Sequence, residues 1–491
     1  MRVLFTHSYF LRLDAKQWKQ QQPYPPLATI QAAAFIRDNK YEVELFDVMF
    51  EKEASAVIET INKFKPDFFV VYDDGFNYLT KMCLTNMREA AFEMIAHAKK
   101  AGCKIIVSSS DSTDHSENYL KAGADFIIIG EAELTLKELL DDVSNDGNNC
   151  ANIRGLAYFE NNKLIKTAPR EILKELDSLP LPAWDLVGIE KYRSAWEKST
   201  GYFSINVFTT RGCPFKCNWC AKPIYGNRYN ARSPELVVKE IKLLKENYGI
   251  EHVWFCDDIF GLKPGWIKKF SGLMQKNNLL IPFKIQCRVD LLLEEENIKH
   301  LADAGCDEVW VGAESGSQKI LDAMDKGTTV SQIYDATANL RKHKIKPCFF
   351  IQFGYLGETL DDIKQTIKMV MDLMPYHIGV SVSYPLPGTK FFEKVKDELK
   401  SKSNWSDSDE LVLMFKNTYQ PQFYKILHRY LHQVYRSKQS AQILWALTSG
   451  KEKWNKRNVL NVISLPVRIP LSFFYQIRLK MAGDRNTSYI F

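Results

Sequence analysis

The sequence contains no run of about 18 uninterrupted apolar residues, the length that a membrane-spanning helix requires. The nearest approach, residues 459–477, is interrupted by two prolines, an asparagine and an arginine. The first residues, Met1–Thr6, lack the apolar core and small-residue cleavage site of a secretory signal peptide. We therefore expect neither a membrane span nor an export signal.

Cysteine is present, but it is not arranged as a disulfide scaffold. The ten cysteines are spread over 491 residues, unlike the dense pairing of small secreted domains. Seven of them stand singly, mostly in apolar runs, where a free cysteine behaves as a small buried hydrophobe: Cys83, Cys103, Cys150, Cys256, Cys287, Cys306 and Cys348. This usage favours a reducing compartment, so we predict a cytoplasmic protein.

Charge is low overall and unevenly distributed. The net charge is +6, but residues 401–491 hold 14 Lys and Arg against 5 Asp and Glu, or +9, which leaves −3 for the first 400 residues. No recognisable module carries a basic stripe interleaved with aromatic residues. We therefore expect no nucleic-acid partner, and we assign the basic character to the C-terminal region.

Three cysteines gather in one short stretch near the middle of the chain. Three residues separate Cys213 from Cys217, and two separate Cys217 from Cys220. Thiolates at these intervals suit an iron–sulfur cluster or zinc. A cubane cluster has four irons, so three cysteines leave one iron without a protein ligand. An open coordination position is a site for chemistry, just as it distinguishes a catalytic zinc site from a structural one. The alternatives are chance and a structural zinc knuckle whose fourth ligand lies elsewhere.

The first 145 residues alternate short apolar strands with helix-length amphipathic segments, which predicts an α/β domain with a parallel, flavodoxin-like (Rossmann-like) sheet. The pattern alone fits a flavodoxin-like, nucleotide-binding or cobalamin-binding domain equally well. Strands are predicted at residues 3–6, 42–46, 68–72, 104–108 and 126–129. Helices are predicted at residues 27–38, 54–63, 81–100 and 134–143.

Residues 146–200 are predicted to form a linker. Residues 153–168 have the pattern of a β-hairpin, with Asn161 and Asn162 at a turn that needs positive φ. The closely spaced prolines Pro180 and Pro182 hold the following stretch extended, which suits a connector.

Residues 201–400 show six further strand–helix units, which predicts a partial (β/α)6 barrel with its chemistry at the carboxyl ends of the strands. Strands are predicted at residues 205–210, 253–256, 283–287, 308–312, 348–353 and 378–384. Helices are predicted at residues 234–247, 265–276, 295–304, 331–343 and 361–373.

The basic C-terminal region, residues 401–491, is predicted to be mainly helical. Residues 423–444 form a candidate helix that either caps the active site or is a solvated tail. Residues 459–477 form either a packing segment or a peripheral contact with a membrane or an apolar substrate, because basic residues flank apolar ones there.

The order of these features resembles the cobalamin-dependent branch of the radical S-adenosylmethionine (radical SAM) superfamily. The three-cysteine stretch carries the resemblance most specifically, followed by the segment Gly312-Ala313-Glu314-Ser315-Gly316-Ser317. The proline-rich residues 23–27, the segment 123–133 that ends Gly-Glu-Ala-Glu, and the proline-rich linker are also similar to that branch.

The resemblance implies site residues. Cys213, Cys217 and Cys220 would bind a 4Fe-4S cluster, and an aromatic residue, here Trp219, would pack near the adenine of SAM. Further SAM contacts are implied at the strand ends: Asp258, Arg288, Gly312, Glu314 and Ser315. Arg288 has an alternative role in an ion pair with a nearby aspartate, and Glu314 has one as a structural carboxylate. No catalytic acid or base is identified.

The resemblance also implies a reaction. The reduced cluster would split SAM into methionine and a 5′-deoxyadenosyl radical, which removes hydrogen from an unactivated carbon of a small molecule or lipid. Methylcobalamin would then donate a methyl group, and a flavodoxin or ferredoxin would supply electrons. The alternatives are a non-methylating cyclase or rearrangement enzyme of this architecture and a non-catalytic iron–sulfur or zinc protein.

Two departures from cobalamin-binding proteins stand in the first domain. The sequence has no Asp-x-His-x-x-Gly, so the implied cobalamin would have no histidine beneath its cobalt. The loop expected after the fourth strand is serine-rich, residues 108–114, in place of a Gly-Gly turn. Its hydroxyls can still hydrogen-bond amide groups of the corrin. His7 and His115 lie near this crevice, and each is either a ligand or an ordinary satisfied histidine.

Overall fold

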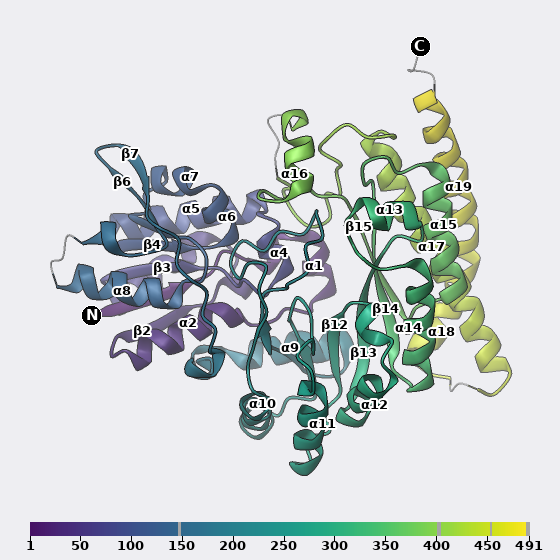
Figure 1. Cartoon of the computed structure of the whole chain (residues 1–491), viewed down its shortest axis with the longest axis horizontal. Helices are drawn as coiled ribbons and strands as arrows, with labels where there is room; N and C mark the ends of the chain where they lie inside the picture. Colours follow the sequence, from purple (N-terminus) through teal and green to yellow (C-terminus); the bar gives the residue numbers. More distant parts are fainter. Residues whose placement is uncertain (146–148, 400–403, 452–453, 488–491) are drawn as a thin grey trace.

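The computed structural model describes residues 1–145, 149–399, 404–451 and 454–487. It contains two α/β units side by side and a set of C-terminal helices that run along the outer flank of the second unit (Figure 1). The predicted boundaries at 145/146 and 400/401 fall next to or on residues outside the described ranges. The division of the chain at 145, 200 and 400 stays a prediction.

The first unit is built on a seven-stranded sheet with the order β2-β1-β3-β4-β5-β6-β7. Its first five strands are parallel, and their order, 2-1-3-4-5, is that of flavodoxin-like folds. The central strand β3 (Phe68–Tyr72) is buried along its whole length, as a parallel strand covered on both faces should be. The other parallel strands are β1 (Arg2–Thr6), β2 (Glu42–Phe46), β4 (Lys104–Ser108) and β5 (Phe126–Ile128).

Four helices of this unit lie close to the predicted segments: α2 (Leu27–Asp38), α3 (Val57–Phe64), α5 (Thr85–Lys100) and α8 (Glu133–Ser144). The prediction did not include α7 (Ser116–Lys121) or the short helices α1 (Ala15–Gln20), α4 (Tyr78–Lys81) and α6 (Ser110–Asp114). The predicted flavodoxin-like class is therefore confirmed.

The predicted hairpin is present, and it belongs to the first sheet. Strands β6 (Leu156–Glu160) and β7 (Lys163–Lys166) are antiparallel, and β6 pairs with β5. Asn161 and Asn162 have φ values of 49° and 61°, the two positive angles that a two-residue hairpin turn requires.

Two sequence predictions in this unit are wrong. The helix predicted at 81–100 begins only at Thr85, because Cys83 has a positive φ of 56° and separates α4 from α5. The stretch predicted to be a serine-rich loop forms helix α6. Serine is a favoured N-cap residue, and here the Ser109 hydroxyl accepts from the Ser112 N–H at 2.8 Å while the Ser112 hydroxyl accepts from the Ser109 N–H at 3.0 Å.

The second unit is a six-stranded parallel sheet with the order β15-β14-β13-β12-β11-β8, which confirms the predicted partial barrel. The strands are β8 (Ser204–Val207), β11 (His252–Phe255), β12 (Phe283–Cys287), β13 (Cys306–Glu314), β14 (Lys346–Phe353) and β15 (His377–Val382). The helices that alternate with them are α10 (Pro234–Tyr248), α11 (Trp266–Lys276), α12 (Glu295–Ala304), α14 (Val330–Lys342) and α15 (Leu360–Leu373), with the short α13 (Gln318–Ala323) and α16 (Lys390–Val395). Helix α9 (Ile189–Thr200) precedes the barrel.

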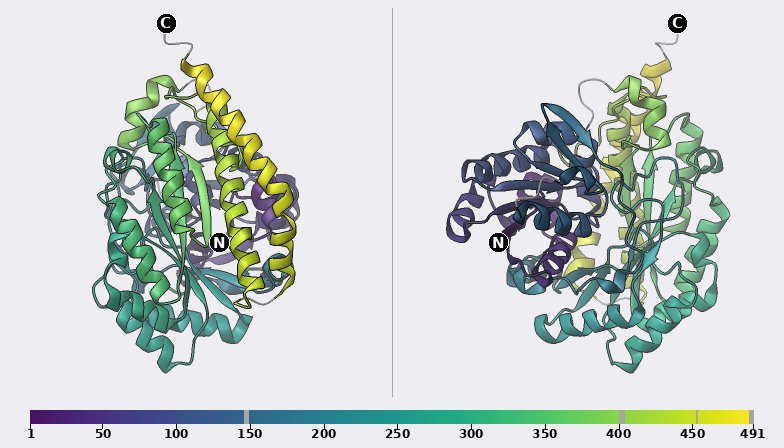
Figure 2. Two further views of the ribbon diagram at one scale, coloured as in Figure 1. Left: turned by 90° about the vertical axis from the view of Figure 1, so that its right-hand side faces the viewer. Right: turned by 60° about the vertical axis from the view of Figure 1, so that its left-hand side comes forward.

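Three helices complete the described chain. Helix α17 (Pro421–Thr448) packs on β15 and α15, and α19 (Leu465–Thr487) runs back along α17 after the short α18 (Lys456–Ile463) (Figure 2). The helix predicted at 423–444 is thus longer than expected, and it covers the β15 edge of the barrel. Within the described part of the chain, no helix combines the length and apolarity needed to cross a bilayer.

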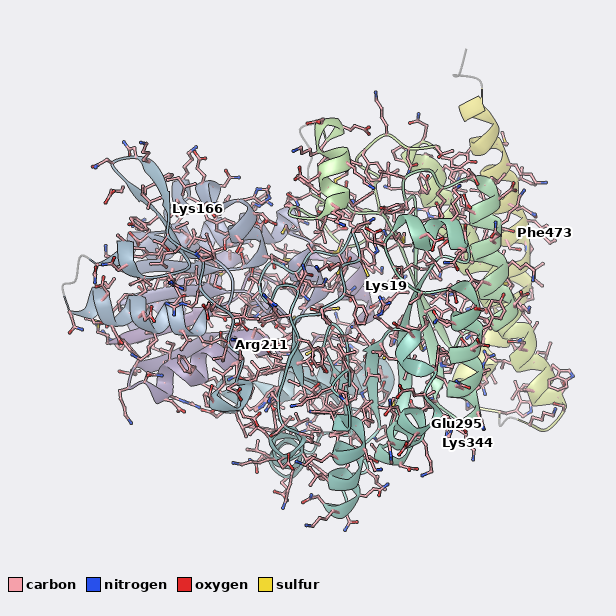
Figure 3. All side chains as sticks on the ribbon, viewed as in Figure 1. Lys19, Lys166, Arg211, Glu295, Lys344 and Phe473 are labelled. Carbon is pink, nitrogen blue, oxygen red and sulfur yellow. The ribbon has the colours of Figure 1, made fainter. Side chains whose placement is uncertain are left out.

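A buried cation joins the two units. Arg211 lies in β9 (Thr210–Arg211), a short strand at the start of the cysteine loop that pairs with β10 (Asn230–Ala231), and its side chain is 1% exposed. Its guanidinium donates to Glu131 at 3.2 Å and to Glu133 at 2.5 Å, both from the end of β5 and the start of α8. Figure 3 shows Arg211 between the two units. The two glutamates of the Gly-Glu-Ala-Glu segment therefore anchor the barrel.

We expect Arg211→Met to lower the free energy of unfolding by about 3–5 kcal/mol, because it leaves two carboxylates buried without their cation. Arg37→Met, which removes a partner of the exposed Arg37–Asp185 pair, is the matched control and should cost less than about 1 kcal/mol. Urea unfolding followed by circular dichroism measures both. The triple variant that adds Glu131→Gln and Glu133→Gln to Arg211→Met should regain part of the lost free energy of unfolding. If Arg211→Met and Arg37→Met lost equal free energy of unfolding, the role given to Arg211 would be contradicted.

Candidate functional site

The strand end that precedes the cysteine loop is fixed by a buried carboxylate. Asp257, directly after β11, accepts from the N–H groups of Thr209 and Thr210 at 2.7 and 2.9 Å and from the Thr209 hydroxyl at 2.5 Å. Burial raises the pKa of Asp257 to about 7, although the bonds from Thr209 act to lower it. Asp257 thereby joins the ends of β8 and β11, the first two strands of the barrel, at the point where the cysteine loop begins.

The cysteine loop is held at its first glycine and at Asn218. Gly212 has a φ of 78°, and a Cβ there would lie 2.5 Å from the carbonyl oxygen of Arg228, so the turn needs glycine. The Asn218 side chain donates to the carbonyl of Ala323 at 2.7 Å and accepts from the Tyr355 hydroxyl at 2.7 Å. Asn218 therefore fastens the loop to the segments that follow the neighbouring strands β13 and β14.

The three thiols are half-buried on this loop, and all are free. Burial raises the pKa of Cys220 to about 12; the charge of Lys222 acts to lower the pKa, and that of Asp258 acts to raise it further. Among the residues that the structure describes, no group of three or more His, Cys, Asp or Glu side chains surrounds a point where one metal ion could sit. A cubane cluster makes a different demand, because each of its protein ligands binds a different iron.

Arg288, after β12, lies against the cysteine loop. Its guanidinium carbon is 3.8 Å from the centroid of the Phe215 ring, and its Nη1 is 3.8 Å from the Cys217 sulfur. Its Nε also donates to Asp290 at 3.0 Å. The ion pair that was one of the two alternatives is present, with Asp290 as its partner. The contact with SAM stays a prediction.

Glu314, at the end of β13, sits in a strained backbone conformation. Its φ is 57°, which is uncommon for a non-glycine residue, and the register of β13 on β14 shifts between Gly312 and Glu314. Such outliers cluster at functional sites, where the surrounding structure enforces them. A Cβ on Gly312 would lie 2.7 Å from the Lys326 Nζ and 2.8 Å from the Glu314 Oε1, so glycine leaves room for this pair of charged groups.

Lys326 is a site residue that sequence reasoning missed. Its ammonium lies 2.8 Å from Glu314, and both side chains are buried. Burial acts to lower the pKa of Lys326, but the charges of Glu314 and Cys217 outweigh it and raise the pKa. Lys326 follows α13 rather than a strand, so the rule that looks for site residues at strand ends does not find it.

Trp219 and Ser315 differ in their hydrogen bonding: the side chain of Ser315 has a partner, and that of Trp219 has none in the described structure. The indole Nε1 of Trp219 is buried and has no hydrogen-bond partner in the described structure, and the ring lies 5.9 Å from the Lys326 Nζ. An unsatisfied buried donor at this position fits a ligand that would accept from it. The Ser315 hydroxyl, in contrast, is 3.0 Å from the Thr366 hydroxyl in the barrel wall.

The first unit reaches the barrel mouth through α4. Lys81 lies 2.7 Å from Asp258, and this charge, opposed by burial, raises the pKa of Lys81. Tyr78, on the same helix, is 49% exposed. Sequence reasoning missed both residues, because it placed their segment at the start of a helix and not at the mouth of the barrel.

The polar groups at the carboxyl edge of the first sheet bind one another. The Ser8 N–H and hydroxyl donate to Asp73 at 2.7 and 2.9 Å, and Arg88 pairs with Asp111. His7 lies 2.9 Å from Asp47 and is buried, so it is a satisfied histidine rather than a free ligand. His115 is 3.6 Å from Asp111.

The comparison with family models identifies the barrel. Residues 207–370 match the model of the radical SAM superfamily. These residues form a radical SAM domain. The match begins at the end of β8 and ends within α15, so it includes the cysteine loop, Arg288, Glu314 and Lys326.

Relatives and solved structures extend the likeness beyond the radical SAM domain. The chain is 28% identical over 419 residues to an uncharacterised methyltransferase of Pyrococcus horikoshii, covering 82% of this chain and 86% of that protein. It is 26% identical over 281 residues to the anaerobic magnesium-protoporphyrin IX monomethyl ester cyclase of Cereibacter sphaeroides, covering 56% of this chain and 45% of the cyclase. The radical SAM methyltransferase TsrM of Kitasatospora setae, solved with cobalamin and a [4Fe-4S] cluster bound, has the same fold, with a TM-score of 0.66 at 19% identity over 81% of this chain and 78% of TsrM.

The raised pKa of Asp257 gives a pH dependence that can be measured. A carboxyl whose folded pKa lies above its unfolded value contributes fully to stability below the unfolded pKa, about 4, and this contribution is lost as the pH rises through about 7. Asp257→Asn stays neutral, so from pH 5 to pH 8 it should lose less stability than the wild type, by on the order of 1 kcal/mol or more.

Urea unfolding at several pH values tests this expectation. The matched control is Asp361→Asn, which changes a side chain that is 83% exposed and should leave the pH profile as it is. Identical profiles for Asp257→Asn and the wild type would contradict the role given to Asp257.

Proposed function

We propose that this radical SAM enzyme is a cobalamin-dependent methyltransferase that acts on an unactivated carbon of a small molecule or lipid. The observation that carries the proposal is the convergence at one barrel mouth of the three-cysteine loop, Arg288 and the buried Glu314–Lys326 pair, facing α4 of a flavodoxin-like unit. The methyltransferase names of the Pyrococcus relative and of TsrM support the reaction type.

When bound, the cluster and SAM supply a 5′-deoxyadenosyl radical and cobalamin supplies a methyl group. Cys213, Cys217 and Cys220 would hold the cluster through three of its irons. Glu314, paired with Lys326, would accept from the amino group of SAM, and Arg288 would pair with the carboxylate of SAM. The free Nε1 of Trp219 would donate to an acceptor of SAM, near the adenine.

The first unit would close the mouth above the cluster. Lys81 and Asp258 fasten α4 against the barrel. Excluding water keeps a reactive radical from side reactions. Cobalamin would bind at the carboxyl edge of the first sheet, the edge at which parallel sheets of this strand order bind ligands. The pocket between that edge and α4 has a free volume of only about 10 Å³, so the side chains as placed leave no room for a corrin directly beneath α4. Helix α6 stands where the resemblance would place a glycine turn.

Further parts of the proposal concern partners and organisation. The electron donor would be a flavodoxin or ferredoxin, and the free cysteines favour the cytoplasm as the place of action. Residues 1–145 would form the cobalamin-binding domain, 146–200 the linker, 201–400 the barrel and 401–491 the C-terminal region.

A non-methylating cyclase is the second candidate, favoured by the likeness to the Cereibacter cyclase. Anaerobic reconstitution with iron, sulfide and cobalamin, followed by reduction with SAM and candidate substrates, separates the readings. Methyl-deuterated SAM should place label in the product of a methyltransferase, and an unlabelled, altered product would favour the cyclase. A full cluster that yields no 5′-deoxyadenosine would contradict radical chemistry altogether.

Cys217→Ala should abolish 5′-deoxyadenosine formation and reduce bound iron, because the cluster loses one of its three ligands. Cys103→Ala, which changes a buried cysteine of the first unit, is the matched control and should keep both. Iron content, the visible spectrum and chromatography of the nucleoside products measure the difference. Full iron content in Cys217→Ala would remove Cys217 from the ligand set.

Lys326→Met should weaken SAM binding at least tenfold, about 1.4 kcal/mol, while iron content stays unchanged. The buried Glu314 would lose the cation that pairs with it, and a buried carboxylate without a partner is strongly destabilised, so the group meant for the amino group of SAM would no longer be held in place. Lys299→Met is the control, since Lys299 pairs with Asp303 on helix α12 and is 61% exposed. Calorimetric titration of reconstituted protein measures the affinity, and equal affinities in the two variants would contradict the role of Lys326.

A further inference from the structure

Helices α18 and α19 present apolar side chains to solvent. The exposed fractions of eight of them lie between 44% and 64%, which is far above the values of core residues. We call this set the C-terminal apolar face: Leu460, Ile463, Val467, Ile469, Phe473, Phe474, Ile477 and Met481. Figure 3 shows Phe473 on the outer flank of the molecule, directed away from the barrel.

The apolar face follows the period of a helix. Val467, Phe474 and Met481 recur every seven residues, and Ile469, Phe473 and Ile477 every four, so all project from one side of α19. The opposite side of α19 packs along α17, where Leu479 is buried. Helix α19 is therefore apolar on both sides, although only one side has a partner within the described chain. Contiguous exposed apolar surface of this kind marks an interaction site.

The charge around the apolar face is mainly positive. From Pro421 to Thr487, the span of α17 to α19, the sequence holds 12 Lys and Arg residues and two acidic residues, Glu452 and Asp484. Arg478 and Lys480 are exposed on α19 beside the apolar residues. A surface that combines apolar side chains with flanking cations is complementary to an apolar phase bordered by anions.

A cavity of about 660 Å³ opens next to this face, between α9, β15, α17 and the α18–α19 segment. Arg436, Arg468, His377 and His432 line it, together with hydroxyl and amide side chains and with Leu460 of the apolar face, and none of its lining residues is acidic. Arg468 donates to the Ser440 hydroxyl at 2.7 Å, and neither arginine forms an ion pair with a carboxylate of the described chain. Two guanidinium groups without counter-charge suit a phosphate.

We propose that the C-terminal apolar face docks on the surface of a bilayer that contains anionic phospholipids, with a lipid phosphate in the adjacent cavity. A bilayer offers both partners at once, acyl chains for the apolar residues and phosphates for the cations. A second copy of this chain fits less well, because a symmetric contact through α19 would bring two basic surfaces together with few acids between them. This contact is peripheral, and it is independent of the cluster and of SAM.

Flotation of the full-length protein with lipid vesicles tests the proposal. Vesicles of phosphatidylcholine mixed with an equal part of phosphatidylglycerol should carry the protein upward, pure phosphatidylcholine vesicles should carry at least tenfold less, and salt should weaken the binding. The double variant Phe473→Glu with Ile477→Glu should lose at least tenfold in binding. Leu280→Glu, which places the same charge at a residue 63% exposed in a loop of the barrel, is the matched control and should bind as the wild type does.

Arg436→Gln with Arg468→Gln tests the cavity separately, and it should lower the preference for phosphatidylglycerol while leaving folding, measured by circular dichroism, intact. Equal binding to both vesicle types would overturn the anionic preference, and an unchanged preference in the arginine variant would overturn the phosphate site. If the protein bound neither vesicle type and formed a dimer in light scattering, the apolar face would be assigned to a second copy, provided that the double variant Phe473→Glu with Ile477→Glu were monomeric. The measurement needs neither cluster nor SAM, so its failure would leave the proposed reaction untouched.

Discussion

The structure depends on one buried interaction, the guanidinium of Arg211 between Glu131 and Glu133. Arg211 directly precedes the glycine that opens the cysteine loop, and the glutamates stand at the carboxyl edge of the first sheet. Because all three side chains are almost fully buried, the pair tolerates neither separation of the units nor water between them. The cysteine loop is thus positioned by the first unit as well as by its own barrel.

The candidate site is held in place by backbone conformations and hydrogen bonds at the ends of the barrel strands. Gly212 and Gly312 make room for close contacts, Glu314 is held in a left-handed conformation, and Asp257 ties two strand ends together. A site supported in this way is ordered before any cofactor binds, which reduces the entropy lost on binding. Two cations belong to this site: Arg288 lies 3.8 Å from the Cys217 sulfur, and Lys326 lies 2.8 Å from Glu314.

Much of the fold could be predicted from the sequence, because apolar periodicity decides where buried strands and amphipathic helices lie. Strands β2, β3, β4 and β12 and helices α2 and α12 have the predicted bounds. The prediction was wrong at two places that depend on local backbone conformation: the Ser109 cap that starts helix α6, and the positive φ of Cys83 that separates α4 from α5. The cysteine loop was found by its spacing. Lys326, Tyr78 and Lys81 were not found, because their roles arise from tertiary contacts that leave no local pattern.

The hairpin β6–β7 has a consequence for solubility. Strand β5 is apolar, and without β6 its backbone groups would form an open edge able to pair with another chain. The hairpin moves the edge outward to β7, which is only four residues long and carries Lys163 and Lys166 at its ends. Short, charged edge strands resist intermolecular pairing. A shortened first unit that ends before Leu156 would therefore leave β5 as an unpaired apolar edge strand and aggregate, even though its five parallel strands were complete.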